Sequence, residues 1–530
     1  MPSDKEIMDK VRKALGQEIL GTDEQKEFSI YWGKKNIAIA TKLIEEFLPD
    51  GGSILDPFVG SGSTIYGALQ GSSTNFVTGV DVNEQPISQI RFNLEECNPI
   101  SYAKADIFFE ELKSIFSDNY TYIINGEKHI FQKCILNLES GLPTISDFLL
   151  RSSETGENLN ITSNHPSYEY VCDRYLQIQT TFSNPTEDLQ LKTNSRIAVK
   201  PGMKISDMYS PLNFNILLWM RSKIANEPYL RGLLSSVLHL TKYTDKGSQS
   251  QFPFWYPKKD AIDRNLIKLL EEKHKQIKKK KPGDENLFAA QKIENSYALF
   301  NVSIKEVGEY LGSKSQDLVI TDPPYFDQVA YSEYLVPWEF FCHSRVNMED
   351  EIVESNRIDA NKTRETYLED MSTAFDAIRN TCKDQALMFF YYKDARLINI
   401  YEILLLLERV GWNFVGQTHI DKKGFSYKQN SSKSTTVEGD CLMVFQVSEP
   451  REIRKELKDS KEKADEFVIM SAKEYVSSTK ASTLSEIYDN VLVKSLYSRG
   501  YLGYYKSPQD IITLLLRELN FEESERKFYV

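Results

Sequence analysis

Short apolar runs alternate with helical apolar patterns near the start of the chain. Apolar positions at helical spacing occupy residues 37–47. Two short runs, 53–58 and 75–81, then have the length and composition of buried strands, and residues 103–107 are expected to form a third strand that ends in an acid. Alternating strands and helices are typical of an α/β fold with a mostly parallel sheet.

The same alternation returns in the second half of the chain. Residues 317–320 and 386–392 are predicted to be buried strands, and residues 397–410 a helix between sheet elements. Residues 412–420 and 441–447 are expected to form a closing antiparallel pair. The two halves therefore predict one Rossmann-like sheet, mostly parallel, that an antiparallel hairpin closes.

The pattern changes between these two halves. Residues 110–200 contain short alternating stretches, at 120–124, 129–136 and 175–182, that are expected to be antiparallel strands. Residues 213–240 show helical spacing of apolar side chains. This middle region predicts a large α+β insertion into the α/β domain.

Four units follow from these changes of pattern. Residues 1–110 and 301–448 are expected to be the two parts of one α/β domain. Residues 111–300 are the expected insertion, and residues 449–530, which are highly charged and then helical, are a C-terminal appendage without a recognisable motif. A chain of 530 residues is long enough for several such units.

Composition narrows the class of protein. The net charge of −12 argues against a protein that coats nucleic acid through bulk charge, although a local basic cleft stays possible. The six cysteines form no C-x-x-C pair and the six histidines no H-E-x-x-H pattern, so no metal site is expected. The start lacks an apolar signal core, and no apolar run is long enough to span a membrane. A cytoplasmic protein with reduced thiols is the expected result.

A glycine loop follows the first predicted strand. Asp56-Pro57-Phe58-Val59-Gly60-Ser61-Gly62 joins that strand to a helix, an arrangement in which glycines let the backbone approach a ligand and the helix start offers free N–H groups. Asp81, 19 residues after Gly62, ends the next strand, close to the spacing expected for a carboxylate that holds ribose hydroxyls. No lysine follows the glycines, which excludes a nucleotide-triphosphate loop. The alternative is a glycine turn without a ligand.

A proline-stiffened turn follows the strand at 317–320. In Asp322-Pro323-Pro324-Tyr325, each proline fixes its own φ and lacks an N–H. Asp322 and the carbonyl of Pro323 can both accept hydrogen bonds from one exocyclic amine, and Tyr325 can stack on the ring that carries the amine. The alternative is a strand-ending turn with a surface tyrosine. Because both turns follow strands, they are expected at the carboxyl edge of the sheet, where open α/β sheets bind ligands.

A basic run lies near the end of the expected insertion. Lysines at positions 275 and 278–281 are the best candidates in the chain for contacts with phosphate groups. A solvated helix end is the alternative interpretation of the run.

The paired motifs resemble those of the S-adenosylmethionine-dependent amino-methyltransferases of DNA. Asp-Pro-Phe-x-Gly-x-Gly with its spaced acid, followed by Asp-Pro-Pro-Tyr, carries the resemblance, which covers roughly residues 30–110 and 300–447. The longer form Asp-Pro-Pro-Tyr-Phe-Asp-x-Val-x-Tyr-Ser-Glu and the stretch Tyr31-Trp32-Gly33-Lys34-Lys35 resemble the large bacterial adenine-specific DNA methylases. Such relatives often carry a cysteine-rich zinc module in the insertion, which this chain lacks.

The resemblance implies roles for individual residues. Asp322 with Pro323, Pro324 and Tyr325 would hold the target amine, and a flipped base would stack on Tyr325 with Phe326 or Tyr331. The cofactor, S-adenosylmethionine, would contact a larger set: Asp56, Phe58, Gly60, Gly62, Asp81, Asp106 and Lys35. Lys275, Lys278, Lys279, Lys280 and Lys281 would contact DNA phosphates.

The resemblance also implies an activity: transfer of a methyl group to adenine N6 in double-stranded DNA, in a bacterial restriction-modification or phage-defence system. A cognate endonuclease or defence subunits would be partners. Methylation of cytosine N4, methylation of RNA or of a protein amide, and a non-catalytic DNA-recognition subunit are the alternatives.

Overall fold

The computed structural model describes most of the chain. The described residues are 2–16, 34–72, 74–137, 144–195, 197, 199–246, 260–280, 296–326, 330–357, 359–392, 396–420, 440–452, 459–522 and 527–530. Residues 31–33 and Lys281, which the sequence singled out, lie outside this set.

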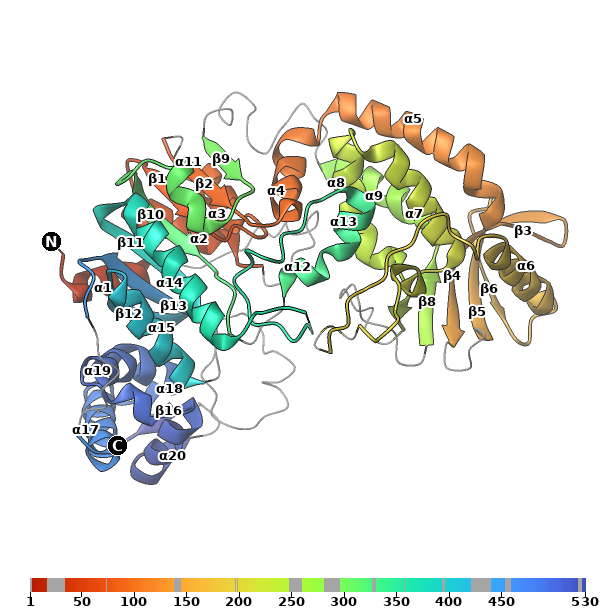
Figure 1. The fold of residues 1–530 in the computed structure, drawn as a ribbon. Helices are drawn as coiled ribbons and strands as arrows, with labels where there is room; N and C mark the ends of the chain where they lie inside the picture. Colours follow the sequence, from red (N-terminus) through yellow and green to blue (C-terminus); the bar gives the residue numbers. More distant parts are fainter. Residues whose placement is uncertain are drawn as a thin grey trace.

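Seven strands of the described chain form the main sheet (Figure 1). Its order is β12-β13-β11-β10-β1-β2-β9, with β11, β10, β1, β2 and β9 parallel to one another and β13 antiparallel to both β11 and β12. The bounds are Ser53–Asp56 (β1), Phe76–Val80 (β2), Tyr297–Phe300 (β9), Gln316–Thr321 (β10), Cys382–Tyr392 (β11), Trp412–Ile420 (β12) and Asp440–Val447 (β13). The predicted mixed α/β architecture with a mostly parallel sheet and a closing hairpin is confirmed.

Successive side chains of the central strands enter two different cores. Leu318 and Ile320 of β10 belong to the apolar cluster that contains α2 (Ile37–Phe47) and α3 (Ser63–Gln70), whereas Val319 belongs to the opposite cluster with α14 (Arg364–Thr381) and α15 (Leu397–Arg409). Alternation with a period of two is the geometry of a strand, and burial on both faces explains why these strands are continuous apolar runs.

A second lobe contains the described residues between 99 and 280 (Figure 1). Its sheet has the order β6-β5-β4-β8-β7, and β3 pairs with β4. The strands are Thr121–Ile124 (β3), Glu127–Asn137 (β4), Thr144–Ser152 (β5), Asn158–Thr162 (β6), Thr244–Asp245 (β7) and Asp260–Arg264 (β8). The helices are Pro99–Phe116 (α5), Tyr168–Thr181 (α6), Pro211–Ile224 (α7), Pro228–Thr241 (α8) and Leu266–Lys280 (α9).

Two strand predictions in this region are wrong. Residues 103–107 lie inside helix α5, which Asn98 caps and Pro99 begins. Residues 175–181 belong to helix α6, because its buried side chains Val171, Tyr175 and Ile178 recur at helical spacing. The strand that pairs with β2 is instead β9, more than 200 residues further along the chain.

Later residues return to the second lobe and complete its core. Helix α12 (Tyr331–Tyr334) and helix α13 (Val336–Cys342) follow the Asp322 turn, and the fully buried Trp338 donates a hydrogen bond to the carbonyl of Ser235 in α8 at 3.1 Å. The chain therefore passes from the second lobe to the main sheet and back again before it continues to α14.

The C-terminal residues form a helical layer on the sheet. Its elements are α17 (Lys461–Thr479), α18 (Leu484–Ile487), α19 (Val493–Ser498), α20 (Pro508–Glu518) and the small strands Ser482–Thr483 (β14), Asn520–Glu522 (β15) and Lys527–Tyr529 (β16). Their apolar side chains share one cluster with α14 and α15. Among the described helices, none combines the length and the apolar character needed to cross a lipid bilayer.

Candidate active site

The glycine loop after β1 is held in a tight turn against β2. Gly60 and Gly62 have φ values of +43° and +80°, conformations that side chains disfavour. The Gly62 amide donates to the Val59 carbonyl at 2.8 Å, and the Val59 amide donates to the Val80 carbonyl at 2.9 Å. These bonds place the start of α3 beside the end of β2, where Asp81 follows.

Asp81 accepts two backbone hydrogen bonds from the loops around it. One carboxylate oxygen accepts from the Gly60 amide at 3.2 Å and the other from the Asn83 amide at 3.0 Å. Burial raises the pKa of Asp81 to about 7, against the opposing effect of these bonds. Burial likewise raises the pKa of Asp56 to about 7, with Asp322 and Asp81 adding to the shift. The site thus brings buried carboxyl groups together. A ligand that donates hydrogen bonds or carries positive charge would stabilise their ionised form.

The proline turn after β10 opens beside the same loop. Asp322 forms an ion pair with Lys35 at 3.0 Å and accepts a hydrogen bond from the hydroxyl of Tyr325. The hydroxyl of Tyr367, on α14, donates to the carbonyl of Pro324 at 2.8 Å and holds the turn from the other side. Lys35 also lies 5.2 Å from the centre of the Tyr391 ring.

Both turns open into one cavity because β1 and β10 are neighbouring parallel strands. Ile54 pairs with Leu318 and Leu55 with Val319, so the residues after both strands emerge at the same edge. The space in and above the cavity is about 950 Å³, including space open to solvent. Predicted residues that line it are Lys35, Asp56, Phe58, Gly60, Asp81, Asp322, Pro324 and Tyr331.

Residues 350–352 form one wall of the cavity, and no motif in the sequence indicated them. Glu351 is buried, accepts a hydrogen bond from the Ser332 amide at 3.0 Å and lines the cavity. Burial raises the pKa of Glu351 to about 7, and Glu333 and Asp81 contribute to the shift. Asp350 and Ile352 line the same wall.

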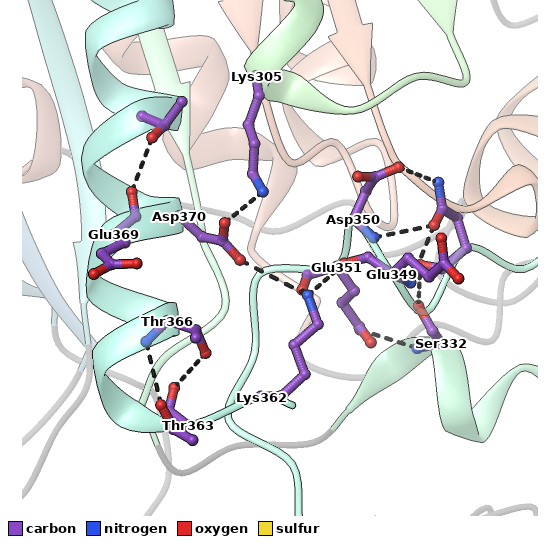
Figure 2. A network of polar contacts seen from close by, with 12 residues as sticks. Lys305, Ser332, Glu349, Asp350, Glu351, Lys362, Thr363, Thr366, Glu369 and Asp370 are labelled. Atoms are coloured by element: carbon purple, nitrogen blue, oxygen red, sulfur yellow. Dashed lines mark hydrogen bonds and ion pairs between the residues drawn. The ribbon is translucent and has the colours of Figure 1, made fainter. Parts of the chain in front are cut away.

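Tertiary contacts of Lys362 hold this wall in place. Figure 2 shows the Lys362 ammonium between the wall and α14, where it donates to the Glu351 carbonyl at 2.8 Å and approaches Asp370 at 3.7 Å. Lys305 contacts the same Asp370 carboxylate at 2.5 Å. Asn83 binds Ser332 at 2.9 Å and so fixes the other end of the wall to the loop after β2.

Several predicted residues lie elsewhere. Asp106 is on α5 and contacts His274 at 3.2 Å and Lys278 at 2.9 Å, away from the cavity lining, so its predicted contact with the cofactor is wrong in this structure. Asn301 directly follows β9, the strand beside β2, and its side-chain Nδ2 donates a hydrogen bond to the Asp81 carbonyl at 3.0 Å. Asp106 was misplaced because residues 103–107 are helical.

The aromatic residues of the proline turn are buried. Phe326 is fully buried, with its ring 4.6 Å from that of Tyr367, and the Tyr325 ring is 5% exposed and packs edge-on against Tyr392. In this conformation neither ring is open to a base, contrary to the prediction. Tyr331, which lines the cavity, is the predicted stacking residue that a base could reach.

The basic run ends helix α9 in the second lobe. Lys278 is engaged with Asp106, while Lys275, Lys279 and Lys280 are exposed. In the described part of the chain, no group of three metal-binding side chains is close enough to hold an ion.

Comparisons with known proteins include two similarities. Residues 316–516 match a family model of the N6/N4 type that is described as DNA methylase. The matched residues begin at β10 and make up less than half of the chain. A crystal structure of a putative DNA modification methylase from Thermus thermophilus is 13% identical, with a TM-score of 0.16; the match covers 31% of this chain and 58% of that chain, less than two thirds of its length. No curated protein sequence matches. The family match supports a DNA methyltransferase.

Proposed function

We propose that the protein transfers a methyl group from S-adenosylmethionine to the N6 amine of an adenine flipped out of double-stranded DNA. The observation that carries this proposal is the single cavity shared by the glycine loop after β1 and the Asp322 turn after β10. The match of residues 316–516 to DNA methylases supports the substrate class. A role in restriction-modification or phage defence, with an endonuclease or defence subunits as partners, belongs to the same proposal.

The residues of the cavity fit this cofactor. Asp56, Asp81 and Glu351 line it with buried carboxyl groups, whose ionisation a cationic ligand favours. S-adenosylmethionine carries a positive sulfonium, an ammonium group and ribose hydroxyls, and when bound it supplies the activated methyl group. Asp81 and the backbone of Gly60 would hold the ribose side, and Asp56 with Phe58 the methionine side.

Asp322 and the turn would act on the target amine. The carboxylate of Asp322 and the carbonyl of Pro323 would accept hydrogen bonds from the two amine hydrogens and leave the nitrogen lone pair directed at the cavity. After methylation the nitrogen carries an extra proton, and Asp322 is the acceptor within reach. Lys35 and Tyr325 hold the Asp322 carboxylate in position. A duplex base must leave the stack to reach this turn, and Tyr331 would then contact its face.

The test is methylation of mixed-sequence duplex DNA with labelled S-adenosylmethionine, followed by digestion to nucleosides and mass spectrometry. Label on N6-methyladenine is the expected result, and Asp322→Ala is expected to abolish it while cofactor binding in calorimetry persists. Label on N4-methylcytosine would show that the target base is cytosine and not adenine. Label only on RNA or protein, or no cofactor binding at all, would overturn it.

A further inference from the structure

Glu351, in the wall of the cavity, has unused hydrogen-bonding capacity. Its side chain is 5% exposed, and Oε1 of its carboxylate accepts a hydrogen bond from the Ser332 amide at 3.0 Å (Figure 2). Among the residues that the structure describes, Ser332 is the sole donor to this carboxylate. The one proton of the Ser332 hydroxyl is engaged by Asn83 Oδ1 at 3.1 Å and by the Asn347 carbonyl at 3.2 Å. Oε2 of Glu351 is therefore left without a donor from the described chain.

The charged groups around Glu351 do not compensate for its burial. Lys362 is the cation beside the wall, but its ammonium donates to the backbone carbonyls of Glu349 and Glu351, at 2.5 Å and 2.8 Å. Burial raises the pKa of Glu351, and the carboxyl groups of Glu333 and Asp81 add to the shift. An ionised carboxylate in such a place is costly without donors, so a ligand in the cavity that donates a hydrogen bond would stabilise it.

A series of hydrogen bonds places Glu351 beside Asp81. The Asn83 amide donates to Oδ1 of Asp81 at 3.0 Å, and the Asn83 side-chain Nδ2 donates to the Ser332 hydroxyl at 2.9 Å. The Ser332 amide in turn holds Glu351. Asn83 and Ser332 are both buried, so this connection is part of the packed interior. Two carboxyl groups, each held by a backbone amide, therefore line one cavity on adjacent walls.

Ribose presents donors that this pair of carboxyl groups can accept. Its two hydroxyls lie on adjacent carbon atoms, and each can donate one hydrogen bond. Asp81 already accepts a backbone hydrogen bond at each of its oxygens, whereas the described chain supplies none to Oε2 of Glu351. Asp322 is held separately, by Lys35 and Tyr325. The hydrogen bonds of Glu351 thus lead to the Asp81 side of the cavity, where the proposed function places the ribose.

We propose that Glu351 binds the ribose of S-adenosylmethionine, with its Oε2 atom accepting a hydrogen bond from one hydroxyl while Asp81 accepts one from the other. This inference rests on the proposed function and extends it, because it adds a cofactor-binding residue from the wall after α13 to the loops after β1 and β2. The hydroxyl supplies the donor that the buried oxygen lacks.

The experiment combines removal of the carboxylate with removal of each hydroxyl. Calorimetry on the full-length protein measures binding of S-adenosylhomocysteine, the product of methyl transfer, and of its 2′-deoxy and 3′-deoxy forms. Work at about pH 8 keeps Glu351, with its pKa of about 7, mostly ionised. Glu351→Gln should weaken binding of S-adenosylhomocysteine about 10-fold to 100-fold, the range for one hydrogen bond to a charged group. Glu349→Gln removes an exposed charge from the same segment and is the matched control, so its affinity should be unchanged.

One of the two deoxy forms should cancel the effect of the substitution. The form that lacks the contacted hydroxyl should bind the unmodified protein and Glu351→Gln equally weakly, since the hydrogen bond is then missing in both. The other deoxy form should retain the difference between the two proteins. Urea denaturation at the same pH checks that Glu351→Gln is at least as stable as the unmodified protein, so that weaker binding does not reflect loss of the fold.

The outcomes separate this inference from the proposed function. If the unmodified protein binds neither S-adenosylmethionine nor S-adenosylhomocysteine, the proposed function fails. If it binds both and methylates DNA while Glu351→Gln binds S-adenosylhomocysteine with unchanged affinity, the ribose contact alone is wrong. A difference that persists with both deoxy forms, or that appears only with the positively charged S-adenosylmethionine, would overturn the ribose contact in favour of another part of the cofactor. An equal loss in Glu349→Gln would also contradict it, since the effect would then reflect diffuse charge.

Discussion

Replacement of Gly62 by alanine tests how tightly the glycine loop is constrained. Gly62 caps α3 with φ +80° and ψ +17°, and alanine in this left-handed region costs about 1–2 kcal/mol. An added Cβ would also lie 2.8 Å and 2.9 Å from Cγ1 and Cδ1 of Ile90. Ile90 is buried, and its branched side chain has few alternative rotamers, so overpacking adds about 1–3 kcal/mol. The expected total loss of stability is about 2–5 kcal/mol.

Two comparisons separate the two costs in urea denaturation. Gly126 has φ +85° and no atom within 4 Å of an added Cβ, so Gly126→Ala should cost only the backbone part, about 1–2 kcal/mol. Ile90→Val removes Cδ1, and combined with Gly62→Ala it should recover part of the loss in a double-mutant cycle. Because Gly62 positions the loop, Gly62→Ala should also weaken S-adenosylmethionine binding in calorimetry. Equal losses in Gly62→Ala and Gly126→Ala, with no coupling to Ile90, would show that contact with Ile90 adds nothing to the cost.

Three further predictions concern the cavity. Burial raises the pKa of Glu351 from 4.5 to about 7, so the folded protein holds a proton that the unfolded chain releases, and stability should fall as pH rises between these values. In urea denaturation, Glu351→Gln should therefore be more stable than the unmodified protein by about 1–3 kcal/mol at pH 8 but not near pH 4.5. Glu349→Gln, which changes an exposed side chain, should show no such pH dependence. Lys35→Met removes the ion pair with Asp322 and should lower kcat for methylation about tenfold with little change in cofactor affinity; a weaker cofactor Kd with unchanged kcat would instead place Lys35 on the cofactor. Tyr367→Phe removes the hydrogen bond to Pro324 and should lower kcat about threefold to tenfold without changing the KM for cofactor, and an unchanged kcat would show that the prolines alone hold the turn.

The main sheet could be predicted because its strands are buried on both faces. Such strands are continuous apolar runs, and the turns that directly follow them contain the glycines and carboxyl groups of the site. Gly60, Asp81 and Asp322 are therefore expected at one edge of the sheet, and all three line one cavity. The order in which the strands pair depends on tertiary contacts that no local pattern encodes. The strand beside β2 comes from residues 297–300, not from residues 103–107, whose local pattern predicts a strand.

The errors had local signals of helix. Asn98 followed by Pro99 is a helix start, and Val171, Tyr175 and Ile178 follow helical spacing, although short stretches of both segments also fit the alternation of a strand. Glu351 had no such signal. Its place in the cavity depends on Lys362 and Asn83, which act through tertiary contacts that no spacing in the chain reveals.

The pairing of Ile54 with Leu318 also has a consequence for synthesis of the protein on the ribosome. At typical elongation rates of about 5–20 residues per second, roughly 15–50 s pass between the synthesis of β1 and the synthesis of its neighbour β10. During that time one edge of the nascent sheet stays open, while most of the second lobe, from α5 to α9, is translated. An exposed apolar edge of this kind is a template for association with other chains, so the newborn protein is most vulnerable to aggregation before β10 emerges.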